Sequence, residues 1–141
     1  MNERVRRLAT VAAGAALAIG AANVVAPAAE AATYPVKSFT AKYGNTYATG
    51  RVTFYNQSVL VEVTVKATSG SGCRAARATT FDKIELHDHF TTQGVCDSSP
   101  DYFAETLNAS NRGGAAYVKV ELLSDGGSDS GKTLATVNVY R

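Results

Sequence analysis

The stretch GRVTFYNQSVLVEVTVK, from Gly50 to Lys66, decides the fold that this sequence predicts. If Asn56-Gln57 forms a two-residue turn, the chain folds back on itself in a single register. That register pairs Phe54 with Val59, Val52 with Val61 and Arg51 with Glu62. One face is then entirely apolar: Val52, Phe54, Val59, Val61, Val63 and Val65. Polar residues dominate the other face, so the alternation predicts a β-hairpin with one side on a core and one side in water.

The rest of the chain contains further short stretches with the composition of strands and shows no convincing helical periodicity. Candidate strands lie at 73–81, 84–95, 102–108, 116–123 and 133–140, separated by turn signals. Together with the hairpin they give about seven or eight strands without intervening helices. The sequence therefore predicts an all-β protein, a single antiparallel β-sandwich or a small barrel.

The first 31 residues have the pattern of an export signal. Arg4, Arg6 and Arg7 precede an Ala-rich apolar run, and Ala29-Glu30-Ala31 has small residues at the two positions that signal peptidase recognises. The run is too rich in Ala and Gly to favour a membrane anchor. We expect residues 1–31 to be a cleaved signal peptide and the remaining chain to be secreted and extracellular, without a membrane partner.

The segment 32–45 is expected to be an extended N-terminal arm, followed by the β-sandwich domain at 46–141. Pairing of part of this segment as a first strand stays open, but Pro35 and Gly44-Asn45 interrupt its strand pattern. Because the arm is placed outside the sandwich, its removal should leave the fold intact.

Charge and composition argue against a nucleic-acid partner. Residues 1–31 hold three of the 14 basic and two of the 12 acidic residues, so the remaining chain carries a net charge of +1. Its Lys and Arg residues are neither in excess nor clustered, whereas binding by counterion release requires them to be.

Cys73 and Cys96 are the two cysteines of the chain. In an exported protein they are expected to form a structural disulfide. If strands 73–81 and 84–95 form a hairpin about Asp82-Lys83, Cys73 lies opposite Thr92, four residues short of Cys96. The disulfide then requires a bulge, a shifted turn or a bridge between two sheets.

The sharpest polar cluster is the alternating set Glu85, His87 and His89. On a regular strand these three side chains would project from one face, and His-x-His is a spacing used by zinc ligands. They are the candidate metal ligands of this sequence. Paired histidines on a solvent-facing strand are nevertheless common without metal, so we expect no cofactor.

Tyrosines and apolar side chains placed outward are the candidate contacts with a partner. Tyr presents an amphipathic surface at low entropic cost and is enriched in protein interfaces. The candidates are Tyr34, Val36 and Phe39 on the arm, Tyr55 and Leu60 on the outward face of the hairpin, and Tyr117 near the C-terminus. An extended arm can also add to the sheet of a partner or lie in its cleft.

These observations favour a secreted, non-catalytic protein-binding or adaptor module whose partner is another secreted protein. No nucleophile elbow, phosphate loop or dinucleotide fingerprint is present in the sequence. Two alternatives stay open. One is a small metal-dependent enzyme or binder centred on Glu85, His87 and His89, and the other is a secreted protease inhibitor that presents a loop such as 124–131.

The chain resembles small secreted proteins of Streptomyces and its relatives. The resemblance rests on the export signal, on ATGRVTFYNQSV from Ala48 to Val59, on Gly72-Cys73-Arg74 and Val95-Cys96-Asp97, and on the strand Tyr117 to Leu123. One similar group is the small adaptor subunit of the actinobacterial umbrella toxin particles. That likeness implies a subunit of a larger extracellular complex, joined to its partner partly through the segment Ala32 to Thr40.

Overall fold

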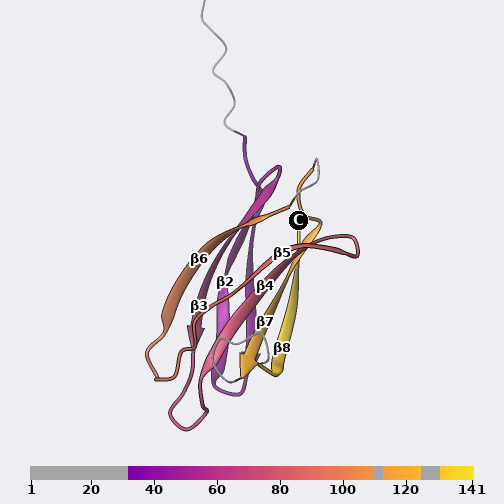
Figure 1. Ribbon diagram of the computed structural model, residues 1–141. Helices are drawn as coiled ribbons and strands as arrows, with labels where there is room; N and C mark the ends of the chain where they lie inside the picture. The colour runs from indigo at the N-terminus through magenta and orange to yellow at the C-terminus, as the bar shows by residue number, and fades with distance from the viewer. Residues whose placement is uncertain (1–31, 110–112, 125–130) are drawn as a thin grey trace, which may run out of the picture. The chain divides into compact units, whose positions relative to one another are not determined.

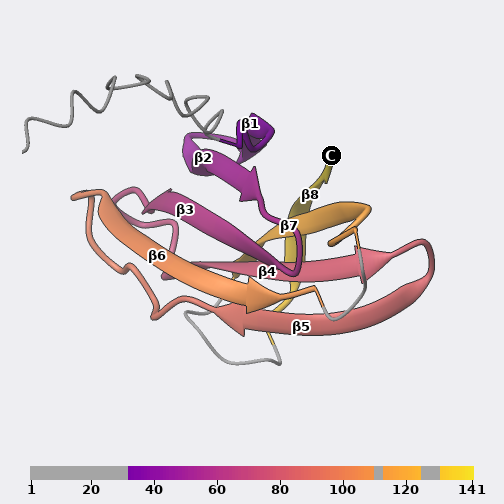
Figure 2. The same cartoon turned by 90° about the horizontal axis from the view of Figure 1, so that it is seen from above.

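The computed structural model describes residues 32–109, 113–124 and 131–141, and these form two antiparallel sheets of four strands each. The strands are β1 (Val36–Tyr43), β2 (Thr46–Phe54), β3 (Ser58–Lys66), β4 (Arg74–Asp82), β5 (Glu85–Thr91), β6 (Asp101–Asn108), β7 (Tyr117–Ser124) and β8 (Thr133–Tyr140). Sheet A has the order β1-β2-β3-β6 and sheet B the order β5-β4-β7-β8 (Figures 1 and 2). The predicted all-β fold with about eight strands is confirmed. The predicted signal peptide, 1–31, lies outside the described residues.

The β2–β3 hairpin has the register that the sequence predicts. Phe54 lies opposite Val59, Val52 opposite Val61 and Arg51 opposite Glu62. The turn closes with the backbone N–H of Tyr55 donating to the carbonyl oxygen of Ser58 at 2.9 Å. The pattern of apolar residues therefore fixed the pairing, because a slip of one residue would have buried the charged pair.

The core lies between the inner faces of the two sheets. The six inward residues of the hairpin are at most 1% exposed: Val52, Phe54, Val59, Val61, Val63 and Val65. Val118, Val120 and Leu122 of β7 face them from sheet B and are fully buried. Burial of each such side chain is worth about 1.5–3 kcal/mol, so the hairpin alone contributes on the order of 10 kcal/mol before chain entropy is subtracted.

The edges of the two sheets also meet. Strand β1 contacts β8, and β5 contacts β6. The Asn108 N–H of β6 donates to the Asp88 carboxylate of β5 at 2.9 Å, and the Thr80 hydroxyl of the neighbouring strand β4 donates to the Asn108 carbonyl oxygen at 2.8 Å. These bonds occupy backbone groups at the end of β6 that an edge strand would otherwise leave unpaired.

The structure differs from the prediction of a free N-terminal arm. Residues Val36–Tyr43 pair with β2 along their whole length, and Phe39 and Ala41 are 5% and 2% exposed in the core. Pro35 precedes the strand, where a missing N–H is tolerated, and Gly44 occupies the following turn with a φ of 58°. The interruptions in the pattern thus bound an edge strand, and only Ala32–Pro35 of the described segment precede the sheet.

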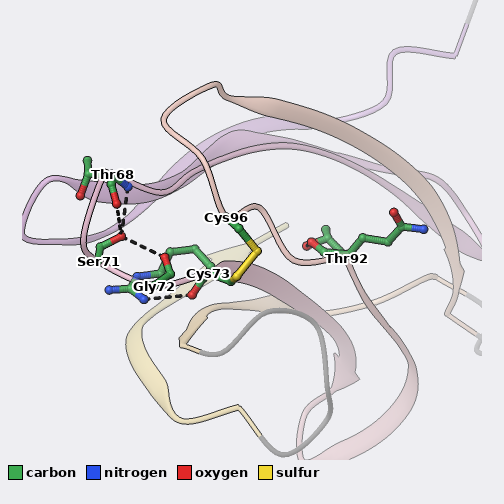
Figure 3. Close-up of a disulfide and its surroundings, with 8 residues drawn as sticks. Thr68, Ser71, Gly72, Cys73, Thr92 and Cys96 are labelled. Atoms are coloured by element: carbon green, nitrogen blue, oxygen red, sulfur yellow. Dashed lines mark hydrogen bonds between the residues drawn. A yellow bond between two sulfur atoms is a disulfide. The ribbon is translucent and has the colours of Figure 1, made fainter.

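The Cys73–Cys96 disulfide is present and closes a sequence separation of 23 residues (Figure 3). A loop of this size stabilises the fold by about 3 kcal/mol in the chain-entropy account. Two of the predicted solutions act together. The turn is shifted to Lys83-Ile84, and a bulge lies opposite Thr80 and Phe81 in β5. These two changes account for three of the four residues, and one further residue is taken up between the Thr92–Ala76 hydrogen bond and the Arg74–Val95 bridge, which brings the two cysteines side by side.

Within the described ranges no helix is long and apolar enough to cross a membrane.

Candidate functional site

The outward face of sheet B carries a continuous row of apolar side chains, one from each strand. Phe81 of β4 is paired with Leu86 of β5 on one side and with Tyr117 of β7 on the other. Tyr117 is in turn paired with Tyr140 of β8. We call Leu86, Phe81, Tyr117 and Tyr140 the aromatic row. Because cross-strand neighbours on one face lie about 5 Å apart, the row crosses the whole sheet.

The rings of the aromatic row pack against one another. The centroids of Phe81 and Tyr117 are 4.9 Å apart with an angle of 4° between the ring planes, and those of Tyr117 and Tyr140 are 5.4 Å apart at 37°. The two ends of the row are open to solvent, since Leu86 is 57% and Tyr140 62% exposed. Solvent-exposed apolar side chains in one row across a sheet form a surface suited to contact with another molecule.

Polar side chains border the aromatic row along the sheet. The next row is formed by His89, Thr79, Lys119 and Asn138, and the row beyond it by Thr91, Arg77, Glu121 and Thr136. A shallow hollow of about 350 Å³ lies between them and is lined by Arg77, Thr79, Phe81, Leu86, His89, Lys119 and Glu121. The face therefore combines an apolar strip with hydrogen-bonding and charged groups.

Glu121 is the electrostatic centre of the polar rows. Its carboxylate accepts a hydrogen bond from Arg77 Nε at 2.9 Å and one from the Thr133 hydroxyl at 3.2 Å, and Lys119 Nζ lies 3.6 Å away. Burial disfavours the charged carboxylate, but the hydrogen bond from Arg77 and the charges of Arg77 and Lys119 outweigh it, so the pKa of Glu121 is lowered. Lys119 also lies over the ring of Phe81, 5.7 Å from its centroid, and links the polar rows to the aromatic row.

The Glu121→Gln variant should lose less of its free energy of unfolding than the wild type does when the pH is lowered. Because the pKa is lower in the folded chain, the stabilisation is present above the unfolded pKa and is lost as the pH falls through the folded value. Urea unfolding of both proteins from about pH 6 to pH 3 measures this dependence. Glu105→Gln, at an exposed carboxylate on β6, is the control. Parallel curves for wild type and Glu121→Gln would contradict the ion-pair account.

Of the predicted partner contacts, Tyr117 lies in the aromatic row and the others lie elsewhere. Tyr55 and Leu60 are half-buried in sheet A, and Tyr34 packs on Tyr55 with ring centroids 4.8 Å apart at 72°. Val36 is 54% exposed on the same sheet. Phe39 belongs to the core and does not offer its ring to a partner. The candidates therefore divide between the two sheets.

Sequence reasoning missed Phe81 and Leu86. The alternation of β4 places Phe81 on the side of Arg77 and Thr79, which could have been recognised. The position of Leu86 on this face could not have been recognised from the sequence. Asp88 pairs with Thr80 and Leu86 with Phe81, so the bulge leaves one extra residue, His87, between these two partners. Side chains of a regular strand alternate between the two faces of the sheet, and the extra residue breaks this alternation, so the faces can no longer be assigned from sequence position.

The same bulge changes the prediction for Glu85, His87 and His89. These residues do not follow one another on a regular strand: Glu85 pairs with Asp82 beside the turn, His89 pairs with Thr79, and His87 is the extra residue. Among the described residues no group of three or more His, Cys, Asp or Glu side chains could hold a metal ion. The structure thus does not bring the predicted ligand set together.

Comparison of the chain with protein-family models, with curated proteins and with solved structures gives no match.

Proposed function

We propose that this chain is an extracellular, non-catalytic protein-binding module that contacts its partner through the outward face of sheet B. The observation that supports the proposal is the aromatic row, in which each of the four strands contributes one apolar side chain. The disulfide is consistent with an oxidising compartment outside the cytoplasm. A secreted protein is accordingly the proposed partner.

The composition of this face favours a protein partner. Specific interfaces have an apolar centre enriched in aromatic residues and Arg, surrounded by polar groups. The aromatic row supplies the apolar part, and Arg77, Glu121 and Lys119 lie beside it. The mutual ion pairs of these three residues hold the polar rows in place, so little side-chain freedom would be lost on binding.

The ring geometry favours protein over carbohydrate. A sugar that stacks on an aromatic residue requires the face of the ring, where the π electrons lie. Here the rings of Phe81 and Tyr117 are stacked on each other with centroids 4.9 Å apart, so one face of each ring is already covered. Edges and hydroxyl groups contact aliphatic and aromatic protein side chains in edge-to-face geometry.

An adaptor requires a second surface, and sheet A supplies a candidate. Tyr34 and Val36 are exposed at the start of the described chain, and Tyr34 stacks edge-on against Tyr55. This group lies on the sheet opposite the aromatic row. The proposal therefore includes the adaptor role in a larger extracellular particle that the sequence resemblance implies, with one partner on each sheet.

The double substitution Leu86→Ser with Tyr140→Ser tests the sheet B surface. Both side chains are more than half exposed, so the free energy of unfolding should change by less than about 1 kcal/mol. A tagged protein is used to capture the partner from the culture supernatant, and the purified partner is then titrated. We expect the double variant to bind at least about tenfold more weakly.

The matched control is Tyr43→Ser with Tyr102→Ser, which removes two aromatic side chains of similar exposure, 53% and 62%, from sheet A. The control should bind as the wild type does. Weaker binding of every captured protein by the control, together with unchanged binding of each of them by the sheet B variant, would refute the proposal.

A further inference from the structure

The tip of the β4–β5 hairpin carries an apolar side chain that has no packing role. Lys83 and Ile84 form the turn between the paired residues Asp82 and Glu85. Ile84 is 91% exposed, the largest exposure of any bulky apolar residue described. Figures 1 and 2 both show this hairpin projecting away from its neighbouring strands. The fold gains almost no burial from Ile84.

The turn also departs from the residues that its backbone prefers. Lys83 has a φ of 55°, in the left-handed region where Gly and Asn are favoured, and it is the one residue other than Gly with a positive φ among those described. Two-residue hairpin turns are most often Asn-Gly or Asp-Gly. Neither a Lys at positive φ nor an exposed β-branched residue is among the residues that such turns favour. Such departures concentrate at sites of function.

The surroundings of Ile84 match those of an interface anchor. Charged residues flank it on the chain: Asp82, Lys83 and Glu85. Beyond them Leu86 begins the aromatic row, because the bulge at His87 sets Leu86 beside Phe81. Residues that dominate the binding energy of an interface lie in well-packed, desolvated pockets and are surrounded by contacts that exclude water. Ile84 thus extends the aromatic row to a protruding tip.

We propose that Ile84 is the anchor of the sheet B interface and inserts into an apolar pocket of the partner protein. This inference rests on the proposed function. The tip residues Asp82 to Glu85 carry one net negative charge, which favours a partner whose pocket has a basic rim. The hollow beside Arg51 and Glu62 is lined by this charged pair together with Ser38, Thr64 and Tyr102, so it does not offer the apolar pocket that Ile84 would enter on a second copy. The negative tip likewise disfavours an anionic lipid surface.

The test begins with a photo-cross-linking amino acid placed at position 84 of the full chain. The labelled protein is irradiated in the culture supernatant, and the adduct is identified by mass spectrometry. The proposal expects an adduct with the same protein that wild type captures, at residues that line an apolar pocket. A covalent dimer of this chain, or no adduct, would overturn it.

Binding of that purified protein is then measured for Ile84→Asp and for Gln57→Asp, which places the same charge at the tip of the β2–β3 hairpin. Loss of a buried Ile side chain weakens binding by about 10- to 100-fold. Gln57→Asp should bind as wild type does, and both variants should unfold at the wild-type urea concentration. If Ile84→Asp binds with wild-type affinity, Ile84 is not the anchor of the interface. If Leu86→Ser with Tyr140→Ser still binds weakly in that case, the proposed function stands, and if it does not, both proposals fail.

Discussion

Replacing Gly50 with Ala should lower the free energy of unfolding by at least about 4 kcal/mol, a loss that few single substitutions reach. A Cβ atom at this position would lie 1.9 Å from the backbone oxygen of Glu62, 2.9 Å from its carbonyl carbon and 3.0 Å from the Cα of Val63. All three atoms belong to the backbone of β3. The strands can separate only if the valines of β3 leave their positions in the core.

The same substitution at Gly44 is the control. Gly44 lies in the β1–β2 turn with a φ of 58°, and a Cβ there would meet nothing within 4 Å. The free energy of unfolding of Gly44→Ala then falls only because Ala disfavours a positive φ, by about 1–2 kcal/mol. Urea unfolding of both variants provides the comparison. A loss for Gly50→Ala no greater than that for Gly44→Ala would show that the β2–β3 pair is not packed as described.

Deleting residues 32–40 should abolish stable folding, the reverse of what the sequence predicts. The deletion removes Val36–Thr40 of β1 and with them Phe39, which is 5% exposed in the core. Truncating a buried Phe to Ala alone costs about 3–5 kcal/mol, and here the backbone pairing with β2 is lost as well. The Phe54 N–H also loses its acceptor, the Pro35 carbonyl oxygen at 2.9 Å.

Thermal unfolding followed by circular dichroism measures this effect. Deletion of Ala32 and Thr33 alone is the control, because both residues are exposed and precede the sheet. That shorter protein should melt at the wild-type temperature. An unchanged melting temperature after deletion of residues 32–40 would show that the fold does not require β1 and would support the prediction of a free N-terminal arm.

The fold was predictable where alternation was strong and undecided where it was weak. On both sides of the Asn56-Gln57 turn, at 52–54 and at 59–65, every second residue is a buried apolar one, so sequence alone determined the register. In β1 only Phe39 and Ala41 are buried, and a Pro and a Gly at its ends interrupt the sequence pattern of the strand. An edge strand has one partner and few buried residues, so its signal is intrinsically faint.

The candidate site was predictable to the extent that the strands are regular. Alternation in β7 placed Tyr117 outward, and the structure pairs it directly with Tyr140 of β8. The bulge in β5 could not be predicted, because one extra residue leaves no compositional trace. It moved Leu86 into the aromatic row and disrupted the spacing of the two histidines.

The central claim, that sheet B is the binding surface, is tested most directly by chemical-shift mapping on isotope-labelled protein. The purified partner is added in steps while backbone amide and side-chain signals are followed. The account predicts the largest changes at Ile84, Leu86, Phe81, Tyr117 and Tyr140, with the outward threonines Thr49 and Thr64 of sheet A unchanged. Changes confined to sheet A with every captured protein, with the aromatic row unaffected by any of them, would contradict it.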